Sequence, residues 1–202
     1  MTIWRAQKPL VLASRSRARQ IVLANAGLGF ACDPAEIDER AVQATSGLTS
    51  PRDIAALLAR EKALSVSTRR PDQYIIGADQ TLALGTRIFN KPADRLQAFQ
   101  QLRALSGHRH ELYSAVAAAR GGRILFEHVA IARMTMRRLG EAETEAYLNQ
   151  AGEAVTSSVG AYQLEGLGVH LFEAVEGDHF TILGLPLLPL LAFFRAEGLL
   201  GI

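Results

Sequence analysis

Three cations stand at the start of a predicted helix, in the segment Ser14-Arg15-Ser16-Arg17-Ala18-Arg19. The backbone dipole at a helix N-terminus favours negative charge and disfavours positive side chains. A bound anion, held by the free N–H groups and the Ser16 hydroxyl, would remove this conflict, and phosphate is the obvious candidate. Ser16 could equally be an ordinary N-cap with the arginines in solvent. The segment alone does not decide between the two interpretations.

Carboxylates form a second group: Glu36, Asp38 and Glu39 lie in one turn-like segment, and Asp79 follows a buried strand. A hydrolase that acts on a triphosphate needs carboxylates to hold Mg²⁺ and to activate a water molecule. The first three residues could also form a solvated loop. Asp79 lies between two very apolar segments, where a charged residue is rarely filler, although an aspartate in a strand-end turn is a fair alternative.

Two lysines, Lys62 and Lys91, are candidate ligands for phosphate oxygens. An ammonium group is a usual point charge for that purpose. Lys91, which lies beside Pro92, is the better candidate for a positioned charge. Taken singly, each lysine is more often an exposed surface residue, because lysines are seldom fully buried.

Several familiar sites are missing from the sequence. The run His108-Arg109-His110 lacks the further ligands at recognisable spacing that zinc requires. There is no glycine-rich loop ending in Lys-Ser or Lys-Thr, and no Gly-x-Ser-x-Gly turn. The common nucleotide-binding loop and the esterase site are therefore excluded.

Strand-like and helix-like segments alternate along the chain, which predicts an α/β fold. The segment Gly77-Ala78-Asp79-Gln80 is expected to join two strands, so Asp79 should lie at or near a strand end. A diglycine, Gly121-Gly122, predicts an antiparallel hairpin. The expected strands are Leu10–Ala13, Tyr74–Ile76, Thr81–Leu84, Leu112–Ala119, Ile124–Met136 and a segment near His170–Val175. The expected helices are Arg17–Ala26, one from Pro51 through Leu64, Asp94–Leu105, Glu141–Asn149 and a last one from about Pro186.

Composition limits the function classes. The 202 residues contain no repeat or linker and predict one domain, residues 1–202. The single cysteine, Cys32, favours a reducing compartment, and the N-terminus lacks a signal peptide, so we expect the cytoplasm. The most apolar stretch, Ile182–Phe194, is too short to span a membrane. A formal net charge of +2 is too balanced for duplex nucleic acid binding.

The ordered series of short motifs from about Leu10 to Phe194 resembles the Maf family, also called septum formation protein Maf. Two departures matter: Arg17 stands where the family usually has Pro, and Ala18 where it often has Arg or Trp. The motifs are Leu12–Arg19, Ile37-Asp38-Glu39, Glu61-Lys62-Ala63, Gly77–Gln80, Lys91-Pro92, Leu105–His110, Gly160–Gly166 and Gly184–Leu187.

The resemblance implies a mixed, elongated α/β structure with a cleft between two lobes, and a cytoplasmic protein that is often a homodimer. It also implies a nucleoside triphosphate pyrophosphatase, which cleaves between the α and β phosphates and needs a divalent metal, Mg²⁺ or alternatively Mn²⁺. The implied triphosphate ligands are Ser14, Ser16, Arg19, Lys62 and Lys91. Glu39 would help to place the metal. Asp79 would be the general base or, in an alternative division of roles, a metal ligand.

Substrate preference is expected to depend on Gln80, Glu165 and Ala18. Asp-Gln and Glu-Gly resemble the subgroup that acts on 7-methyl-GTP, whereas the subgroup for dTTP and UTP has Asp-Thr and Gln-Gly. Ala18 removes a side chain expected near the base. A rival hypothesis from another class is a nucleotide-binding regulator of septum formation or cell division.

Overall fold

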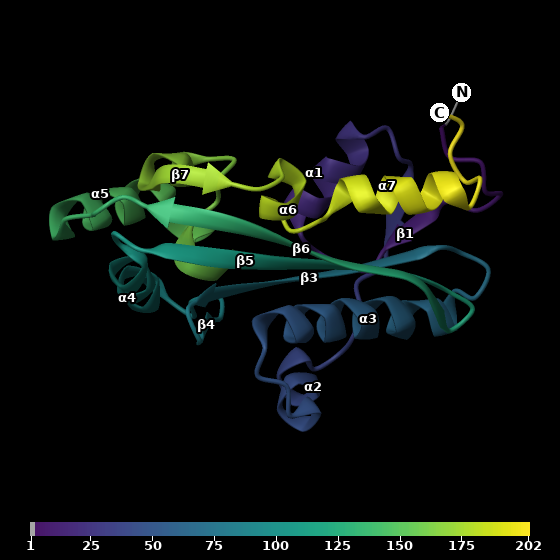
Figure 1. Cartoon of the computed structure of the whole chain (residues 1–202), viewed down its shortest axis with the longest axis horizontal. Coiled ribbons are helices and arrows are strands. Elements are labelled where there is room, and N and C mark those ends of the chain that lie inside the picture. The colour runs from purple at the N-terminus through teal and green to yellow at the C-terminus, as the bar shows by residue number, and fades with distance from the viewer. Residues whose placement is uncertain (1–2) are drawn as a thin grey trace. The chain divides into compact units, whose positions relative to one another are not determined.

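The computed structural model describes residues 3–202, which form a mixed α/β fold with a sheet flanked by helices (Figure 1). Within these residues the sheet has seven strands in the order β2-β1-β3-β5-β6-β7, and β4 pairs with β3 outside that path. The pairs β1–β2 and β1–β3 are parallel, and β3–β4 and β6–β7 are antiparallel. The predicted α/β class is therefore confirmed.

The strands are β1 (Leu10–Leu12), β2 (Phe30–Cys32), β3 (Ile75–Leu84), β4 (Arg87–Phe89), β5 (Arg109–Arg120), β6 (Arg123–Met136) and β7 (Phe172–Glu176). The α-helices are α1 (Arg17–Asn25), α2 (Glu39–Ser46), α3 (Pro51–Arg69), α4 (Arg95–Leu105), α5 (Glu141–Ala151), α6 (His179–Ile182) and α7 (Leu187–Ala196). Three short 3₁₀ helices are η1 (Gly152–Thr156), η2 (Val159–Ala161) and η3 (Leu167–Leu171). No helix among residues 3–202 is long and apolar enough to cross a membrane.

The described chain divides into two compact units. The first unit contains the residues up to Gln80, Ser114–Ala130 and His179–Ile202, and the second contains Thr81–Tyr113 and Ile131–Asp178. The expectation of a single domain over residues 1–202 stays a prediction.

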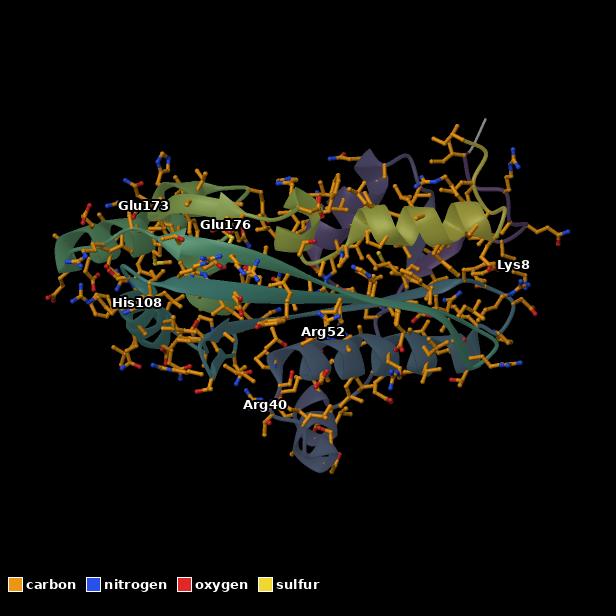
Figure 2. The ribbon with its side chains drawn as sticks, in the orientation of Figure 1. Lys8, Arg40, Arg52, His108, Glu173 and Glu176 are labelled. Atoms are coloured by element: carbon orange, nitrogen blue, oxygen red, sulfur yellow. The ribbon has the colours of Figure 1, made fainter. Side chains whose placement is uncertain are left out.

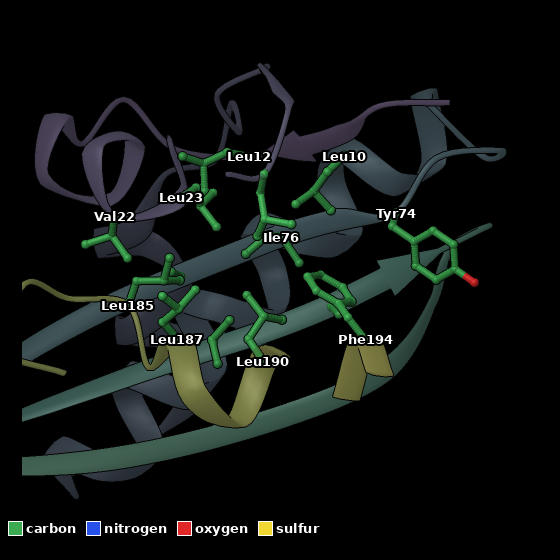
Figure 3. Close-up of a cluster of buried hydrophobic side chains, with 14 of the residues drawn as sticks. Leu10, Leu12, Val22, Leu23, Tyr74, Ile76, Leu185, Leu187, Leu190 and Phe194 are labelled. Atoms are coloured by element: carbon green, nitrogen blue, oxygen red, sulfur yellow. The ribbon is translucent and has the colours of Figure 1, made fainter. Parts of the chain in front are cut away.

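Helices cover both faces of the strands in the first unit, with α3 on one side and α1 and α7 on the other (Figure 1). Side chains alternate along β1 and its following residue, as a strand requires. Leu10 and Leu12 pack with residues of α1 and α7 (Figure 3), whereas Val11 and Ala13 pack with Val66 of α3. A strand buried on both faces therefore carries Ser14 and the start of α1.

Asp79 lies inside β3, not at a strand end, which corrects our expectation of a turn at Gly77–Gln80. Gly77 instead allows close packing of α3 against the strand. A Cβ atom on Gly77 would lie 2.1 Å from the backbone oxygen of Ala59 and 2.6 Å from the backbone nitrogen of Ala63. The missing side chain lets α3 lie directly against β3, and the strand continues through Asp79 to Leu84.

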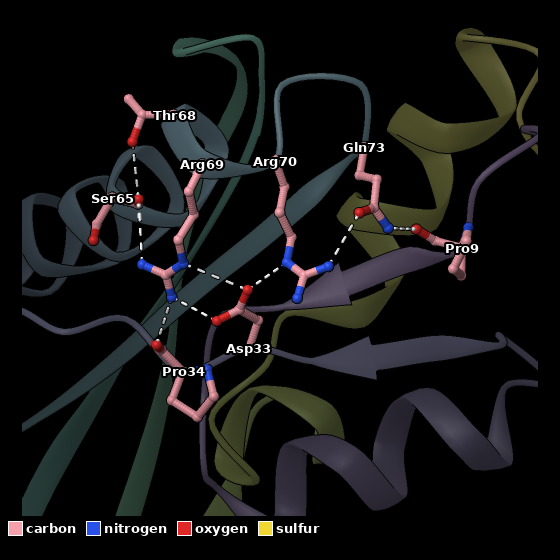
Figure 4. Close-up of polar contacts among 8 residues, drawn as sticks. All are labelled: Pro9, Asp33, Pro34, Ser65, Thr68, Arg69, Arg70 and Gln73. Carbon is pink, nitrogen blue, oxygen red and sulfur yellow. Dashed lines mark hydrogen bonds and ion pairs between the residues drawn. The ribbon is translucent and has the colours of Figure 1, made fainter.

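Asp33, directly after β2, anchors the C-terminal end of α3 (Figure 4). One carboxylate oxygen accepts a hydrogen bond from Arg69 Nη2 at 2.6 Å, and the other accepts from Arg70. Hydrogen bonds from Arg69 and Arg70 lower the pKa of Asp33. This ion-pair cluster fixes the end of the helix that also carries Lys62.

The hairpin is confirmed as β5 and β6, which are neighbours in the sheet. Only Gly121 and Gly122 connect them, and so short a connection requires antiparallel strands. The late strand begins at Phe172, because a 3₁₀ helix takes up Leu167–Leu171. The elements β2, α2, β4 and α6 were not expected from sequence patterns; each is short.

Candidate active site

Lys62 joins two carboxylates in the first unit. Its Nζ lies 2.7 Å from Oδ1 of Asp79 and 2.8 Å from Oε1 of Glu39. The side chains of Lys62 and Asp79 are only 10% and 11% exposed, whereas that of Glu39 is 51% exposed. A buried ammonium and carboxylate are tolerated because each neutralises the other. Three residues predicted separately from the sequence are thus brought together.

Three elements position these side chains. Lys62 lies on the face of α3 that packs against β3 at Gly77, and Asp79 follows two residues later on the strand. Other cations on the neighbouring helices are exposed, as Arg40 on α2 and Arg52 on α3 are (Figure 2). Lys62 is therefore the cation that α3 directs inward.

Asp38 holds α2 in place and so serves the site indirectly. Its carboxylate caps the helix by accepting hydrogen bonds from the backbone N–H groups of Arg40 and Ala41, at 3.1 and 3.0 Å. The cap places Glu39 in the first turn, where a carboxylate is favoured by the helix dipole. The acidic segment is thus a helix start, and Glu36 remains exposed before it.

Arg19 is buried and already bonded within the protein. Its Nη1 donates to Ser14 Oγ at 3.2 Å and to the Ala78 carbonyl at 2.7 Å, and its Nε donates to the Gly184 carbonyl at 2.8 Å. Burial lowers the pKa of Arg19, while the charges of Asp79 and Glu39 oppose that shift. Arg19 therefore holds α1, β3 and the turn before α7 together, beside the acidic pair.

The start of α1 has an N-cap, but no acidic side chain in its first turn balances the positive end of the helix dipole. Ser16 Oγ accepts from the backbone N–H of Arg19 at 3.5 Å, and the N–H of Ser16 donates to Ser14 Oγ at 3.2 Å. Ser16 is therefore an N-cap. The first turn contains no acidic residue, and Arg15 and Arg17 are exposed. The remaining N–H groups of a first turn have no acceptor within the helix, which leaves a position suited to an anion.

Gln80 uses its amide within the first unit. Its Nε2 donates to Ser114 Oγ at 2.9 Å and to the carbonyls of Thr181 and Ile182 at 3.2 and 3.0 Å. Ser114 also donates to the Thr181 carbonyl, at 2.6 Å. Sequence reasoning missed Ser114; the one available signal was a polar residue inside the apolar run Leu112–Ala119.

Two predicted site residues, Lys91 and Glu165, belong to the second unit. Lys91 is exposed just after β4 and makes no hydrogen bond or ion pair with the rest of residues 3–202. Glu165 is exposed within a turn that Gly166 closes by donating its N–H to the Gln163 carbonyl at 3.2 Å. The predicted specificity residues also include Ala18, which is half-buried in the first turn of α1.

Glu39 and Asp79 are carboxylates that could together hold a divalent metal ion. Glu39 and Asp79 both contact one nitrogen atom, so their carboxylates lie close together. Mg²⁺ usually binds through one or two carboxylates together with phosphate oxygens and water. Among residues 3–202 no group of three or more His, Cys, Asp or Glu side chains could hold a metal ion, so a cage of protein ligands alone is not formed there.

Comparison with known proteins assigns the family. The Maf family, described as Maf-like protein, matches residues 9–197. The chain is 65% identical to a nucleoside triphosphate pyrophosphatase of Bradyrhizobium diazoefficiens over 202 residues, covering 100% of both chains. It is 64% identical over 202 residues to a protein of the same name in Rhodopseudomonas palustris, again covering 100% of both. A 7-methyl-GTP pyrophosphatase of Rhizobium etli is 52% identical over 94% of this chain and 96% of its own. The chain therefore belongs to the Maf family.

Proposed function

We propose that this chain is a nucleoside triphosphate pyrophosphatase, which hydrolyses the bond between the α and β phosphates to give a nucleoside monophosphate and pyrophosphate. The observation that carries the proposal is the contact of the buried Lys62 with Asp79 and Glu39, next to Arg19 and the start of α1. Family membership and the names of the 65% and 52% identical relatives support it.

Binding of the triphosphate would use positive charge and N–H donors. Ser14, Ser16, Arg19, Lys62 and Lys91 are the proposed ligands. Arg19 is already oriented by three hydrogen bonds, so little conformational freedom is lost when a phosphate approaches. The positive end of α1 adds to the attraction of an anion.

Water activation would fall to Asp79. Hydrolysis joins the water oxygen to one phosphorus atom, the bridging oxygen leaves with the other phosphate, and Asp79 accepts the proton of the water. Lys62 Nζ donates a hydrogen bond to Asp79 Oδ1. Were Lys62 to turn to a phosphate oxygen, the carboxylate would become available. Glu39 and Asp79 would hold Mg²⁺, which supplies neutralisation of phosphate charge. In the alternative division of roles Asp79 is only a metal ligand.

Glu165 supports 7-methyl-GTP as the preferred substrate. A carboxylate offers only acceptors, which suits the adjacent N1–H and N2–H₂ donors of guanine, and its charge favours the cationic methylated base. The 52% identical relative carries the name 7-methyl-GTP pyrophosphatase. Ala18 provides no aromatic ring to stack on that base, so selectivity is expected to be modest. The alternative within the family is dTTP and UTP.

The deciding experiment compares kcat/KM for 7-methyl-GTP, GTP, dTTP and UTP with Mg²⁺ or Mn²⁺, scored by pyrophosphate release. We expect kcat/KM to decrease in that order. In Glu165→Gln we expect a smaller difference in kcat/KM between 7-methyl-GTP and the two pyrimidine nucleotides. A preference for dTTP or UTP would overturn the substrate assignment but not the reaction. Tight nucleotide binding with no turnover of any of the four would favour the regulator of cell division instead. A homodimer in the cytoplasm completes the proposal, and sedimentation of the purified protein tests the dimer.

A further inference from the structure

Two consecutive residues of the second unit, Gly160 and Ala161, have positive φ, and Tyr162 follows them in extended conformation. Gly160 has φ 77° and Ala161 has φ 61°, and Ala161 is the one non-glycine residue among residues 3–202 with positive φ. Side chains with a Cβ rarely adopt this region, and such strain persists only where surrounding contacts hold it. It is also typical of segments with a function.

Side chains from three different elements hold this segment. The N–H of Gly160 donates to Gln101 Oε1 of α4 at 3.1 Å, and Tyr147 Oη of α5 donates to the Ala161 carbonyl at 3.2 Å. A hydrogen bond of 2.8 Å joins Tyr162 Oη to Nε2 of His110 on β5. Each of the three residues is therefore fixed by a separate partner. We call these three partners, Gln101, His110 and Tyr147, the clamp.

Gly160 has no space for a side chain in this conformation. A Cβ atom on Gly160 would lie 2.6 Å from Leu82 Cδ1. The Tyr162 ring packs against Phe172, with ring centroids 4.7 Å apart. His110 is 1% exposed, and its Nδ1 has no hydrogen-bond partner in residues 3–202. An unsatisfied buried nitrogen is unfavourable, and the contacts of the ring with Tyr162 and Phe172 offset that cost.

The clamped segment leads directly into the turn that carries Glu165. Gln163 begins this turn, and its Nε2 donates to Ser157 Oγ at 2.8 Å. A Cβ atom on Gly168 would lie 2.3 Å from the Gln163 carbonyl oxygen, so the chain returns in direct contact with the base of the turn. Glu165 itself is exposed. Its backbone is thus fixed on both sides while its carboxylate stays free.

We infer that Gln101, His110 and Tyr147 are positioning residues for base selection: by holding the segment 160–162, with Ala161 at positive φ, they preorganise the turn that presents Glu165. The inference rests on the proposed function. Preorganisation raises selectivity because the carboxylate need not be ordered when the base arrives. Loosening the clamp therefore weakens discrimination between bases and leaves phosphate chemistry intact.

The test compares Tyr147→Phe, which removes one hydroxyl, with the unmodified protein on 7-methyl-GTP and dTTP. We expect the ratio of their kcat/KM values to fall by about threefold to tenfold, the range for one lost hydrogen bond. The change should appear in KM for 7-methyl-GTP, with kcat retained. A purely structural role would instead lower the active fraction, and therefore kcat, for both substrates equally, which would overturn the inference.

Two further comparisons separate the outcomes. In Glu165→Gln protein, Tyr147→Phe should have no further effect on the ratio, because the clamp acts through Glu165. Gln101→Glu keeps the acceptor for Gly160 and should retain the ratio, whereas Gln101→Met should lose it; both remove the Gln101 donor to the Asn90 carbonyl. The exposed neighbour Gln100→Met is the control on the same helix. If the unmodified protein hydrolyses none of these nucleotides, the proposed function fails. If it hydrolyses them and the clamp variants keep the same ratio of kcat/KM for 7-methyl-GTP and dTTP, only the inference fails.

Discussion

Asp79 and Lys62 form an ion pair within the first unit. Both are buried, and their contact of 2.7 Å replaces the water that each charge loses on folding. The types of these residues were visible in the sequence, but their contact was not, because they are 17 positions apart and on different elements. Local patterns predict which side chains have suitable chemistry, whereas long-range packing decides which of them meet.

Asp79→Asn should leave the protein folded and reduce turnover by at least about a hundredfold, the usual scale for losing an acid–base group. The amide oxygen can still accept a hydrogen bond from Lys62, so the burial of the pair is largely preserved. Steady-state kinetics with Mg²⁺ and the circular dichroism spectrum measure the two effects. Asp38→Asn is the matched control, because asparagine also caps a helix; near-normal turnover in Asp79→Asn would exclude either catalytic role.

Replacing Lys91 or Arg19 by alanine should have different effects on stability. Lys91 is exposed and unpaired within residues 3–202, so Lys91→Ala is expected to weaken triphosphate hydrolysis without changing thermal stability. Arg19 makes three internal hydrogen bonds, so Arg19→Ala should lower both activity and the free energy of unfolding. Kinetics and thermal unfolding of the two variants check this. Loss of stability in Lys91→Ala with normal kinetics would contradict its assignment to the phosphate site.

At the scale of elements, strands and helices that follow hydrophobic periodicity were predictable, and contacts between them were not. The helix at Pro51 was expected through Leu64, and the structure extends it to Arg69. The glycine at position 77 was taken for a turn because glycine often marks one. Only the approach of α3 to the strand reveals that the glycine provides space, and that Asp79 lies inside β3 as a result.

The stabilisation that Asp33 gives to the end of α3 should depend on pH. Its folded pKa is lowered by Arg69 and Arg70, so its stabilisation is present above the unfolded pKa and is lost as pH falls through the lower, folded pKa. Asp33→Asn is therefore expected to lower the free energy of unfolding by about 1 kcal/mol near neutral pH, with a difference that shrinks in acid. Urea unfolding of both proteins at several pH values measures it. A constant difference across the acid range would assign the effect to packing instead.

At the scale of the whole molecule, a second group should make stability depend on pH. His110 is buried against Tyr162 and Phe172, and burial lowers its pKa to about 4. Because the folded pKa is lower than the unfolded one, protonation favours the unfolded chain. Stability should fall as pH decreases from about 6.5 towards about 4, by up to about 3 kcal/mol. His110→Phe should flatten this dependence in urea unfolding, and an unchanged slope would show that other groups cause it.

The same variants test whether residues 1–202 form one domain. Asp33 belongs to the first unit and His110 to the second. If the chain is one cooperative domain, both variants shift a single unfolding transition. The protein has one tryptophan, Trp4, which is buried in the core of the first unit, so its fluorescence reports that unit while far-ultraviolet circular dichroism reports the whole chain. We expect the two probes to give coincident transitions in the unmodified protein and in both variants. Should His110→Phe shift the circular dichroism curve but leave the Trp4 curve in place, the two units would unfold separately and the single-domain prediction would be wrong.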